Sequence, residues 1–263
     1  MNSTTRARHL CSGALSALLA LGFDAVAAPP EPAADKTSAV VAATALSPRQ
    51  QAIPLIAASM AVSDMPRLNA ALNLGLDRGL SISEAKEVLV QLYAYVGFPR
   101  SLNALNELMA VVQQRRQRGI VDEPGREPGR AVPVGDELLA LGKANQTTIA
   151  GAPVQGPLFD FAPLINQYLQ AHLFGDIFAR DNLDWQSREL ATVGALAATP
   201  GVEAQLRSHM AASVRVGLSA AQLQQLIELL AEHGDGQAAT RARDALTQAQ
   251  ANSPQLFQAS EKP

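Results

Sequence analysis

Residues 174–219 have the sequence FGDIFARDNLDWQSRELATVGALAATPGVEAQLRSHMAASVRVGLS, and this stretch decides the fold. Apolar residues recur at helical spacing on both sides of Thr199-Pro200-Gly201, which predicts two amphipathic helices separated by a turn. Glu189 lies in the first helix and His209 in the second. Because each lies on or beside an apolar face, the turn would allow the two side chains to face each other.

A carboxylate beside an imidazole can transfer protons near neutral pH, so Glu189 and His209 are the candidate catalytic residues. Arg188, Arg207 and Arg215 are the nearby cations that could bind the carboxylate of a substrate. Arg207 is two residues from His209, so we expect it on a different helix face. In the alternative interpretation, Glu189 is a first-turn helix carboxylate paired with an arginine, and His209 only packs.

The same order of signals occurs about 138 residues earlier, which predicts an internal duplication. Leu46-Ser47 corresponds to Leu183-Asp184, and Gly79-Leu80-Ser81 corresponds to Gly217-Leu218-Ser219. The serines after the two glycines each open a capping box, which marks a helix start. We therefore predict a first repeat over residues 46–119, a Pro/Gly-rich linker over 120–157, a second repeat over 158–250 that opens with a helix from about Pro163 to Phe178, and a disordered tail over 251–263.

The beginning of the chain has the pattern of an export signal. Two arginines precede a short apolar stretch that ends in Ala25-Val26-Ala27, which predicts a signal peptide over residues 1–28 and a flexible leader over 29–45. A retained membrane anchor fits less well, because the stretch is short, is interrupted by glycine and is followed by Pro29-Pro30. We expect a periplasmic or secreted protein with no membrane contact after cleavage.

The strings RELATVGALAATPG, residues 188–201, and EAQLRSHMAASVRVGLS, residues 203–219, resemble the carboxymuconolactone decarboxylase family. The resemblance implies an all-α fold, here with two tandem repeats in an alkylhydroperoxidase D-like helical bundle. The absence of strand alternation and a core dominated by Ala, Leu and Val favour the same fold class. The resemblance also implies a homo-oligomeric ring of several repeats, and a duplicated chain could form a six-repeat ring as a trimer.

The first predicted repeat resembles the family in a different part. It has the string LYAYVGFP, residues 92–99, followed by LNAL, residues 102–105, which is similar to the family's tyrosine, Gly-aromatic-Pro and Asn-Ala-Leu ending. It lacks the catalytic pair, since the position of His209 falls near Ala70 and Ala71. We therefore expect Tyr95 and Phe98 to supply an aromatic wall for substrate, with core or interface packing as the alternative.

The reaction that the resemblance implies is decarboxylation of a small unsaturated carboxylate or lactone, which needs no cofactor because a conjugated carbonyl accepts the electrons. A non-catalytic oligomeric binding or scaffold protein on the same fold is the alternative. Alkylhydroperoxidases of the family use a Cys-x-x-Cys pair just before the histidine, where this chain has Val202 and Gln205. Its one cysteine, Cys11, lies in the predicted signal, which disfavours peroxidase chemistry.

Other partners are not indicated. The formal net charge of −3 carries no basic excess, so we expect no nucleic-acid binding. His233 lies beside Glu232 and Asp235, but no second histidine stands four residues away, so we predict no metal site. His172 is predicted to pack rather than react.

Overall fold

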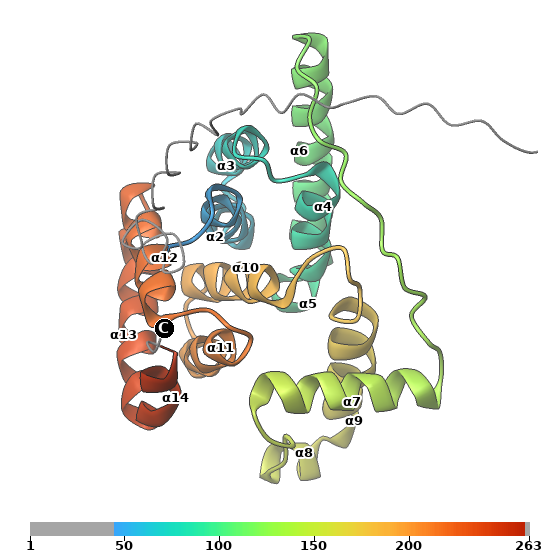
Figure 1. Ribbon diagram of the computed structural model, residues 1–263, viewed down its shortest axis with the longest axis vertical. Helices are drawn as coiled ribbons and strands as arrows, with labels where there is room; N and C mark the ends of the chain where they lie inside the picture. Colours follow the sequence, from blue (N-terminus) through green and yellow to red (C-terminus); the bar gives the residue numbers. More distant parts are fainter. Residues whose placement is uncertain (1–44, 261–263) are drawn as a thin grey trace, which may run out of the picture. The chain divides into compact units, whose positions relative to one another are not determined.

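The computed structural model describes residues 45–260, all of which belong to one compact unit, residues 36–263. The predicted signal peptide and the predicted leader up to residue 44 lie outside the described residues. Every regular element between residues 45 and 260 is a helix, which confirms the predicted all-α class (Figure 1). No helix in this part of the chain combines the length and the apolar character of a membrane span.

A first series of helices follows the predicted starts. Ser47 and Ser81 each form a capping box at the N-terminus of a helix, as the sequence pattern indicates. Pro54 lies inside the first helix without ending it, and the predicted third helix breaks at Leu92. The series consists of α2 (Pro48–Ala61), α3 (Met65–Asp77), α4 (Ile82–Gln91), α5 (Tyr93–Val96) and α6 (Phe98–Gln117).

A second series resembles the first in the lengths of its first two helices and in the capping box of its third helix. It consists of α10 (Trp185–Ala198), α11 (Glu203–Arg215), α12 (Ala220–Glu232) and α13 (Gly236–Asn252). Helices α2 and α10 have 14 residues each, and α3 and α11 have 13 each. Gly79 and Gly217, two residues before the N-caps of α4 and α12, both have positive φ. These features agree with the expected correspondence, and the duplication itself stays a prediction.

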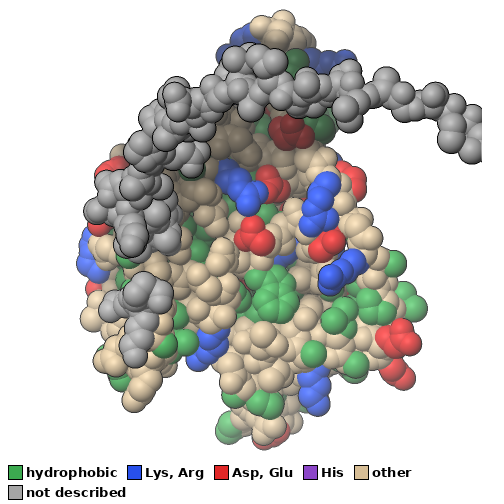
Figure 2. Space-filling model, in the orientation of Figure 1, with side chains coloured by type: hydrophobic (Ala, Val, Ile, Leu, Met, Phe, Trp, Pro, Cys, Tyr) green, Lys and Arg blue, Asp and Glu red, His purple; other side chains and the backbone are tan. Residues whose placement is uncertain are grey.

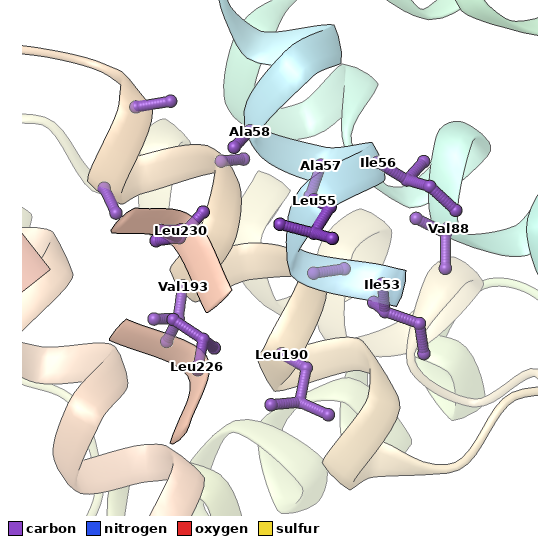
Figure 3. Packing of buried hydrophobic residues seen from close by; sticks show 14 of the residues in the cluster. Ile53, Leu55, Ile56, Ala57, Ala58, Val88, Leu190, Val193, Leu226 and Leu230 are labelled. Carbon is purple, nitrogen blue, oxygen red and sulfur yellow. The ribbon is translucent and has the colours of Figure 1, made fainter. Parts of the chain in front are cut away.

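The two series meet where α2 packs against α10 (Figures 1 and 3). Figure 3 shows Ile53 and Ile56 of α2 in the same buried cluster as Leu190 and Val193 of α10. The helices approach closely at Gly194, because a Cβ atom there would lie 2.7 Å from the backbone oxygen of Pro54. This tight crossing fixes the position of α10, the helix that carries Glu189.

The prediction of a linker over residues 120–157 is partly wrong. Residues 136–150 form a 15-residue helix, α7 (Asp136–Ala150), and it packs against the π-helix η1 (Leu169–Ile177). A Cβ atom on Gly142 would lie 1.7 Å from the backbone oxygen of Gln170, so only glycine permits this approach. The helix expected from Pro163 to Phe178 is divided between α9 (Pro163–Tyr168) and η1, and the short α8 (Pro157–Phe161) precedes it.

The predicted disordered tail is also wrong over residues 251–260. Helix α13 extends to Asn252, and α14 (Pro254–Ala259) follows it. Phe257 of α14 is buried in the main core. The C-terminal helices therefore contribute to the packing around α11.

Charged side chains of both signs are mixed on the face shown in Figure 2, so no single charge dominates it. This mixture accords with the small net charge of the sequence.

Candidate functional site

Glu189 and His209 meet in the structure. The Nδ1 atom of His209 lies 2.7 Å from Oε2 of Glu189, within hydrogen-bonding distance. The Glu189 side chain is fully buried, and that of His209 is 17% exposed. The carboxylate holds one ring nitrogen, which leaves Nε2 of His209 available to a ligand.

The pair lies in a region where buried polar atoms lack partners. Helix α10 is buried from Ser187 to Ala198, so its carboxylate has no access to bulk water. Oε1 of Glu189 and the hydroxyl of Tyr95 are both buried and form no hydrogen bond with the described residues. Because buried polar atoms are normally paired, these two oxygens depart from the usual pattern.

Tyr95 packs directly against the histidine. Its ring meets that of His209 edge to face, with centroids 5.7 Å apart. Burial of the hydroxyl and the negative charge of Glu189 hold the pKa of Tyr95 well above its usual value. Tyr95 therefore keeps its phenolic proton at neutral pH.

A cavity of about 790 Å³ opens beside the pair. Its walls come from α5 of the first series and from α10, α11 and α13 of the second. The segment between the two series contributes α7, α8 and η1. Apolar side chains form most of the lining, and the polar ones include Tyr95, Gln205, Arg207, Ser208, His209, Arg215, Asn252 and Ser253.

Two of the three candidate arginines line this cavity. Arg207 shares the cavity with His209 although it was expected on a different face, and it donates a hydrogen bond to Gln248. Arg215 lies against Gly151, where a Cβ atom would be 2.3 Å from its Nε. Neither arginine pairs with a carboxylate in the described part of the chain. The cavity therefore carries uncompensated positive charge.

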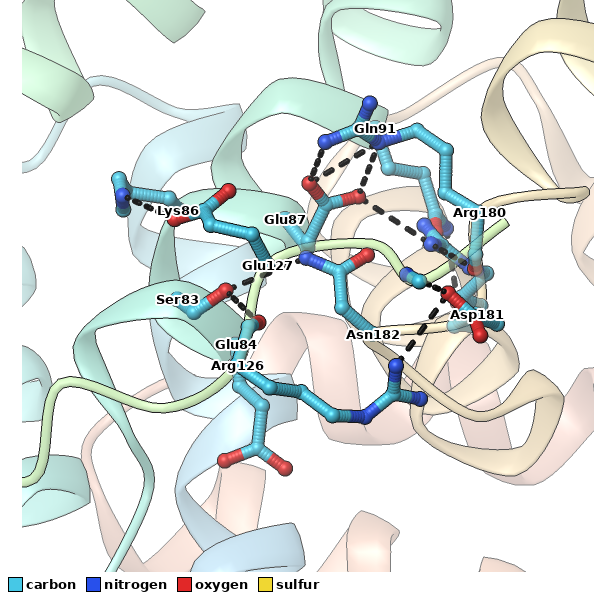
Figure 4. A network of polar contacts seen from close by, with 12 residues as sticks. Ser83, Glu84, Lys86, Glu87, Gln91, Arg126, Glu127, Arg180, Asp181 and Asn182 are labelled. Carbon is cyan, nitrogen blue, oxygen red and sulfur yellow. Dashed lines mark hydrogen bonds and ion pairs between the residues drawn. The ribbon is translucent and has the colours of Figure 1, made fainter. Parts of the chain in front are cut away.

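Arg188 lies elsewhere, contrary to its predicted role in substrate binding. It is fully buried, and its guanidinium donates hydrogen bonds to Glu87 and to the amide oxygen of Gln91. Figure 4 shows that Arg180 contacts Glu87 as well. Nη2 of Arg180 lies 2.6 Å from Oε1 of Glu87. Arg188 therefore joins α10 to α4 instead of lining the cavity.

Phe98 is also outside the cavity. Its side chain is 61% exposed and stacks on Tyr93, with ring centroids 4.2 Å apart. Of the two predicted aromatic residues, only Tyr95 contacts the site.

The residues missed by the sequence analysis lie on the far wall. Phe159, Leu169 and Phe174 come from α8 and η1, and Asn252 and Ser253 come from the end of α13. The dipeptide Ser253-Pro254 is a helix-start signal that could have indicated an ordered C-terminus. No comparable signal identifies the apolar wall, because its position depends on how α7 packs.

Neither His172 nor His233 lines this cavity. Nδ1 of His172 lies 2.7 Å from Oδ2 of Asp176, and both side chains are 45% exposed, so His172 does not simply pack. Nδ1 of His233 is bonded to the backbone oxygen of Leu229. Residues 45–260 contain no group of three or more His, Cys, Asp and Glu residues that could hold a metal ion.

Comparison with known families agrees with this geometry. Residues 163–248 match the carboxymuconolactone decarboxylase family. This segment of the chain is similar to that family. The matched segment extends from α9 into α13 and includes both Glu189 and His209. No curated protein matches the chain.

The structure places Val202 and Gln205 in the cavity lining, at the positions where alkylhydroperoxidases of the family carry cysteines. The described cavity therefore contains no thiol that could attack a peroxide.

Proposed function

We propose that the protein is an exported, cofactor-free lyase that removes CO₂ from a small unsaturated carboxylate or lactone. The observation that carries this proposal is the buried Glu189–His209 pair, which opens on a cavity with two arginines that pair with no carboxylate among residues 45–260. An anionic substrate suits such a cavity because its charge would pair with Arg207 or Arg215.

The proposed reaction uses few protein groups. The bond between the substrate carbon and its carboxylate breaks, CO₂ leaves, and the electron pair moves into the conjugated carbonyl of the substrate. The protonated imidazole of His209 then delivers a proton to carbon, and solvent resupplies that proton. Glu189 would stabilise the imidazolium and fix the ring orientation.

The test is CO₂ release from a panel of unsaturated lactone acids by the full chain. We expect His209→Gln to lower the rate about 10²–10⁴-fold, the usual range for loss of a general acid. The matched control is His172→Gln, which removes a histidine with the same carboxylate distance at a half-exposed position outside the cavity. Equal rates in the two variants would contradict the proposal.

A separate observation supports a second candidate function, that of a non-catalytic scaffold. Phe98, Leu102 and Met109 lie on one side of α6 at spacings of four and seven residues and are 61%, 57% and 65% exposed. Such a stripe suits self-association, and a homo-oligomer accords with both functions. If Leu102→Glu dissociates the assembly while the panel shows no turnover, the scaffold function is favoured.

We propose export to the periplasm or outside the cell on the sequence pattern of residues 1–28 alone. Fractionation of cells that express the full chain, with N-terminal sequencing of the mature protein, tests it. An uncleaved protein in the cytosol would contradict this part of the proposal.

A further inference from the structure

The first helix series contains a cavity at the place that matches the Glu189–His209 site. Glu189 is the fifth residue of α10, and Ala52 is the fifth residue of α2. His209 is the seventh residue of α11, and Ala71 is the seventh residue of α3. Ala71 lines a separate cavity of about 320 Å³.

The two cavities are built alike. The larger one is lined by α11 and by Tyr95, near the end of α5 in the first series. The smaller one is lined by α2 and α3 and by His233, which caps the end of α12 in the second series. Each cavity is therefore lined by one series and by a helix end from the other, and the larger one has a further wall from α7, α8 and η1. Alanine in place of the catalytic histidine leaves the smaller cavity without an acid or base at that position.

The charges in the smaller cavity disfavour an anion. Its one arginine, Arg67, is held by Asp64 at 2.7 Å and lies 3.5 Å from Asp235. Two carboxylates thus compensate a single guanidinium. An incoming carboxylate would meet net negative charge here, unlike in the larger cavity, so a neutral ligand is favoured.

One polar atom in the smaller cavity can orient such a ligand. Nδ1 of His233 lies 2.9 Å from the backbone oxygen of Leu229, and a carbonyl only accepts, so Nδ1 carries the hydrogen. Nε2 of the neutral ring is then an acceptor. Most of the remaining lining is apolar and includes Leu55, Leu74 and Leu230.

We propose that this cavity is a second binding site, for a small neutral phenol whose ring packs on Ala71 and Leu74 and whose hydroxyl donates to Nε2 of His233. The volume, the mostly apolar lining and an uncharged acceptor at His233 match a one-ring molecule with one donor. This site is independent of the proposed decarboxylation, since it shares no lining residue with the larger cavity.

The test is titration of the full chain with phenol and with benzoate, followed by amide signals in NMR spectra at about pH 8, where the phenol keeps its proton. We expect phenol to shift the signals of Ala70, Ala71 and His233 in a saturable way, and benzoate to leave them unchanged. Saturable shifts confined to α10 and α11, no saturable shift at all, or equal affinity for benzoate would each overturn the proposal.

Matched variants locate the binding. Ala71→Leu fills the cavity and should abolish the phenol shifts, and His233→Phe keeps a planar ring without the acceptor and should weaken binding about fivefold, as expected for one hydrogen bond. His209→Phe makes the same change in the larger cavity and should leave phenol affinity unchanged. His233 is exposed, so its variant should fold even if Ala71→Leu does not. Unchanged affinity in His233→Phe, or an equal loss in His209→Phe, would contradict the assignment.

Discussion

The two helix series share a scaffold but differ in the polar residues that they bury. Leu68, Leu72 and Leu76 of α3 are buried at the same places in the helix as Leu206, Met210 and Val214 of α11. At the positions of Glu189 and His209, however, the first series has alanine. Alanine suffices for packing at both places, so the scaffold does not need the pair.

This difference supports a functional role for the pair. Burying a carboxylate and an imidazole costs free energy unless their hydrogen bonds are satisfied, and Oε1 of Glu189 has no hydrogen-bond partner among the described residues. The first series avoids that cost. We infer that the second series tolerates it because the pair acts on a ligand.

A second difference concerns how each series holds the other. Glu87 is the sixth residue of α4 and binds Arg180 and Arg188, which lie just before and inside α10. Gln225 is the sixth residue of α12 and accepts a hydrogen bond from the backbone nitrogen of Leu46, just before α2. The sixth residue of α4 thus makes a buried ionic contact with α10 and the residues before it. The sixth residue of α12 makes a neutral contact with the residue before α2.

The largest effect that we expect on stability comes from Glu87→Ala. Its carboxylate is 5% exposed, and its loss would leave the fully buried guanidinium of Arg188 without its charge partner. Removing one member of a buried ion pair costs about 3–5 kcal/mol in the free energy of unfolding. Urea denaturation followed by circular dichroism measures this cost, and a loss under 1 kcal/mol would show that solvent already screens the contact.

Acid should act on the same contact. Burial alone would raise the pKa of Glu87, but the hydrogen bond from Arg180 and the charge of Arg188 outweigh it and hold the pKa below the usual 4.5. The charged carboxylate therefore stabilises the fold fully above pH 4.5, and this contribution is lost as the pH falls through the lowered pKa. Below pH 4.5, the thermal midpoint of Glu87→Gln should fall less with decreasing pH than that of the unsubstituted protein. An equal fall in both proteins would contradict this.

Gly194→Ala should have an intermediate effect. Gly194 is the tenth residue of α10, and its counterpart in α2 is Ala57, which is fully buried. A Cβ atom on Gly194 would lie 2.7 and 2.8 Å from backbone atoms of Pro54, which cannot move aside as a flexible side chain could. Overpacking of this kind costs about 1–3 kcal/mol.

Ala57→Gly is the matched control for the crossing. It removes a methyl group instead of adding one and should cost about 1 kcal/mol through helix propensity. A stabilised Gly194→Ala variant, judged by its thermal midpoint against this control, would show that the crossing of α2 and α10 is looser than the structure indicates.

Much of the fold and the central pair could be predicted from local patterns. The capping serines and the turn at Thr199-Pro200-Gly201 determine where helices begin and end, and two amphipathic helices about such a turn bring Glu189 and His209 together. These features depend on residues close in sequence. Family similarity added the expectation that Tyr95 lies at the site, and the edge-to-face contact with His209 agrees with it.

What could not be predicted depends on contacts distant in sequence. Helix α10 is buried on every side, so its apolar pattern does not reveal that Arg188 faces Glu87 rather than the cavity. The apolar wall from η1 depends on the close approach that Gly142 of α7 permits, and the Pro- and Gly-rich flanks of α7 concealed the helix itself.

The smallest effect should come from Gln225→Ala, the counterpart of Glu87→Ala. The hydrogen bond from Leu46 to the Gln225 side chain is 2.7 Å long and neutral, and Leu46 itself is buried. A neutral hydrogen bond contributes about 0.5–1.5 kcal/mol, so this variant should lose about 1 kcal/mol in the free energy of unfolding. A loss as large as that of Glu87→Ala would mean that the position matters for packing rather than for its charge. If Glu87→Ala instead loses at least about three times as much free energy of unfolding as Gln225→Ala, the ionic contact with α10 accounts for the larger contribution of Glu87. A neutral hydrogen-bond acceptor is then sufficient at the corresponding position of α12.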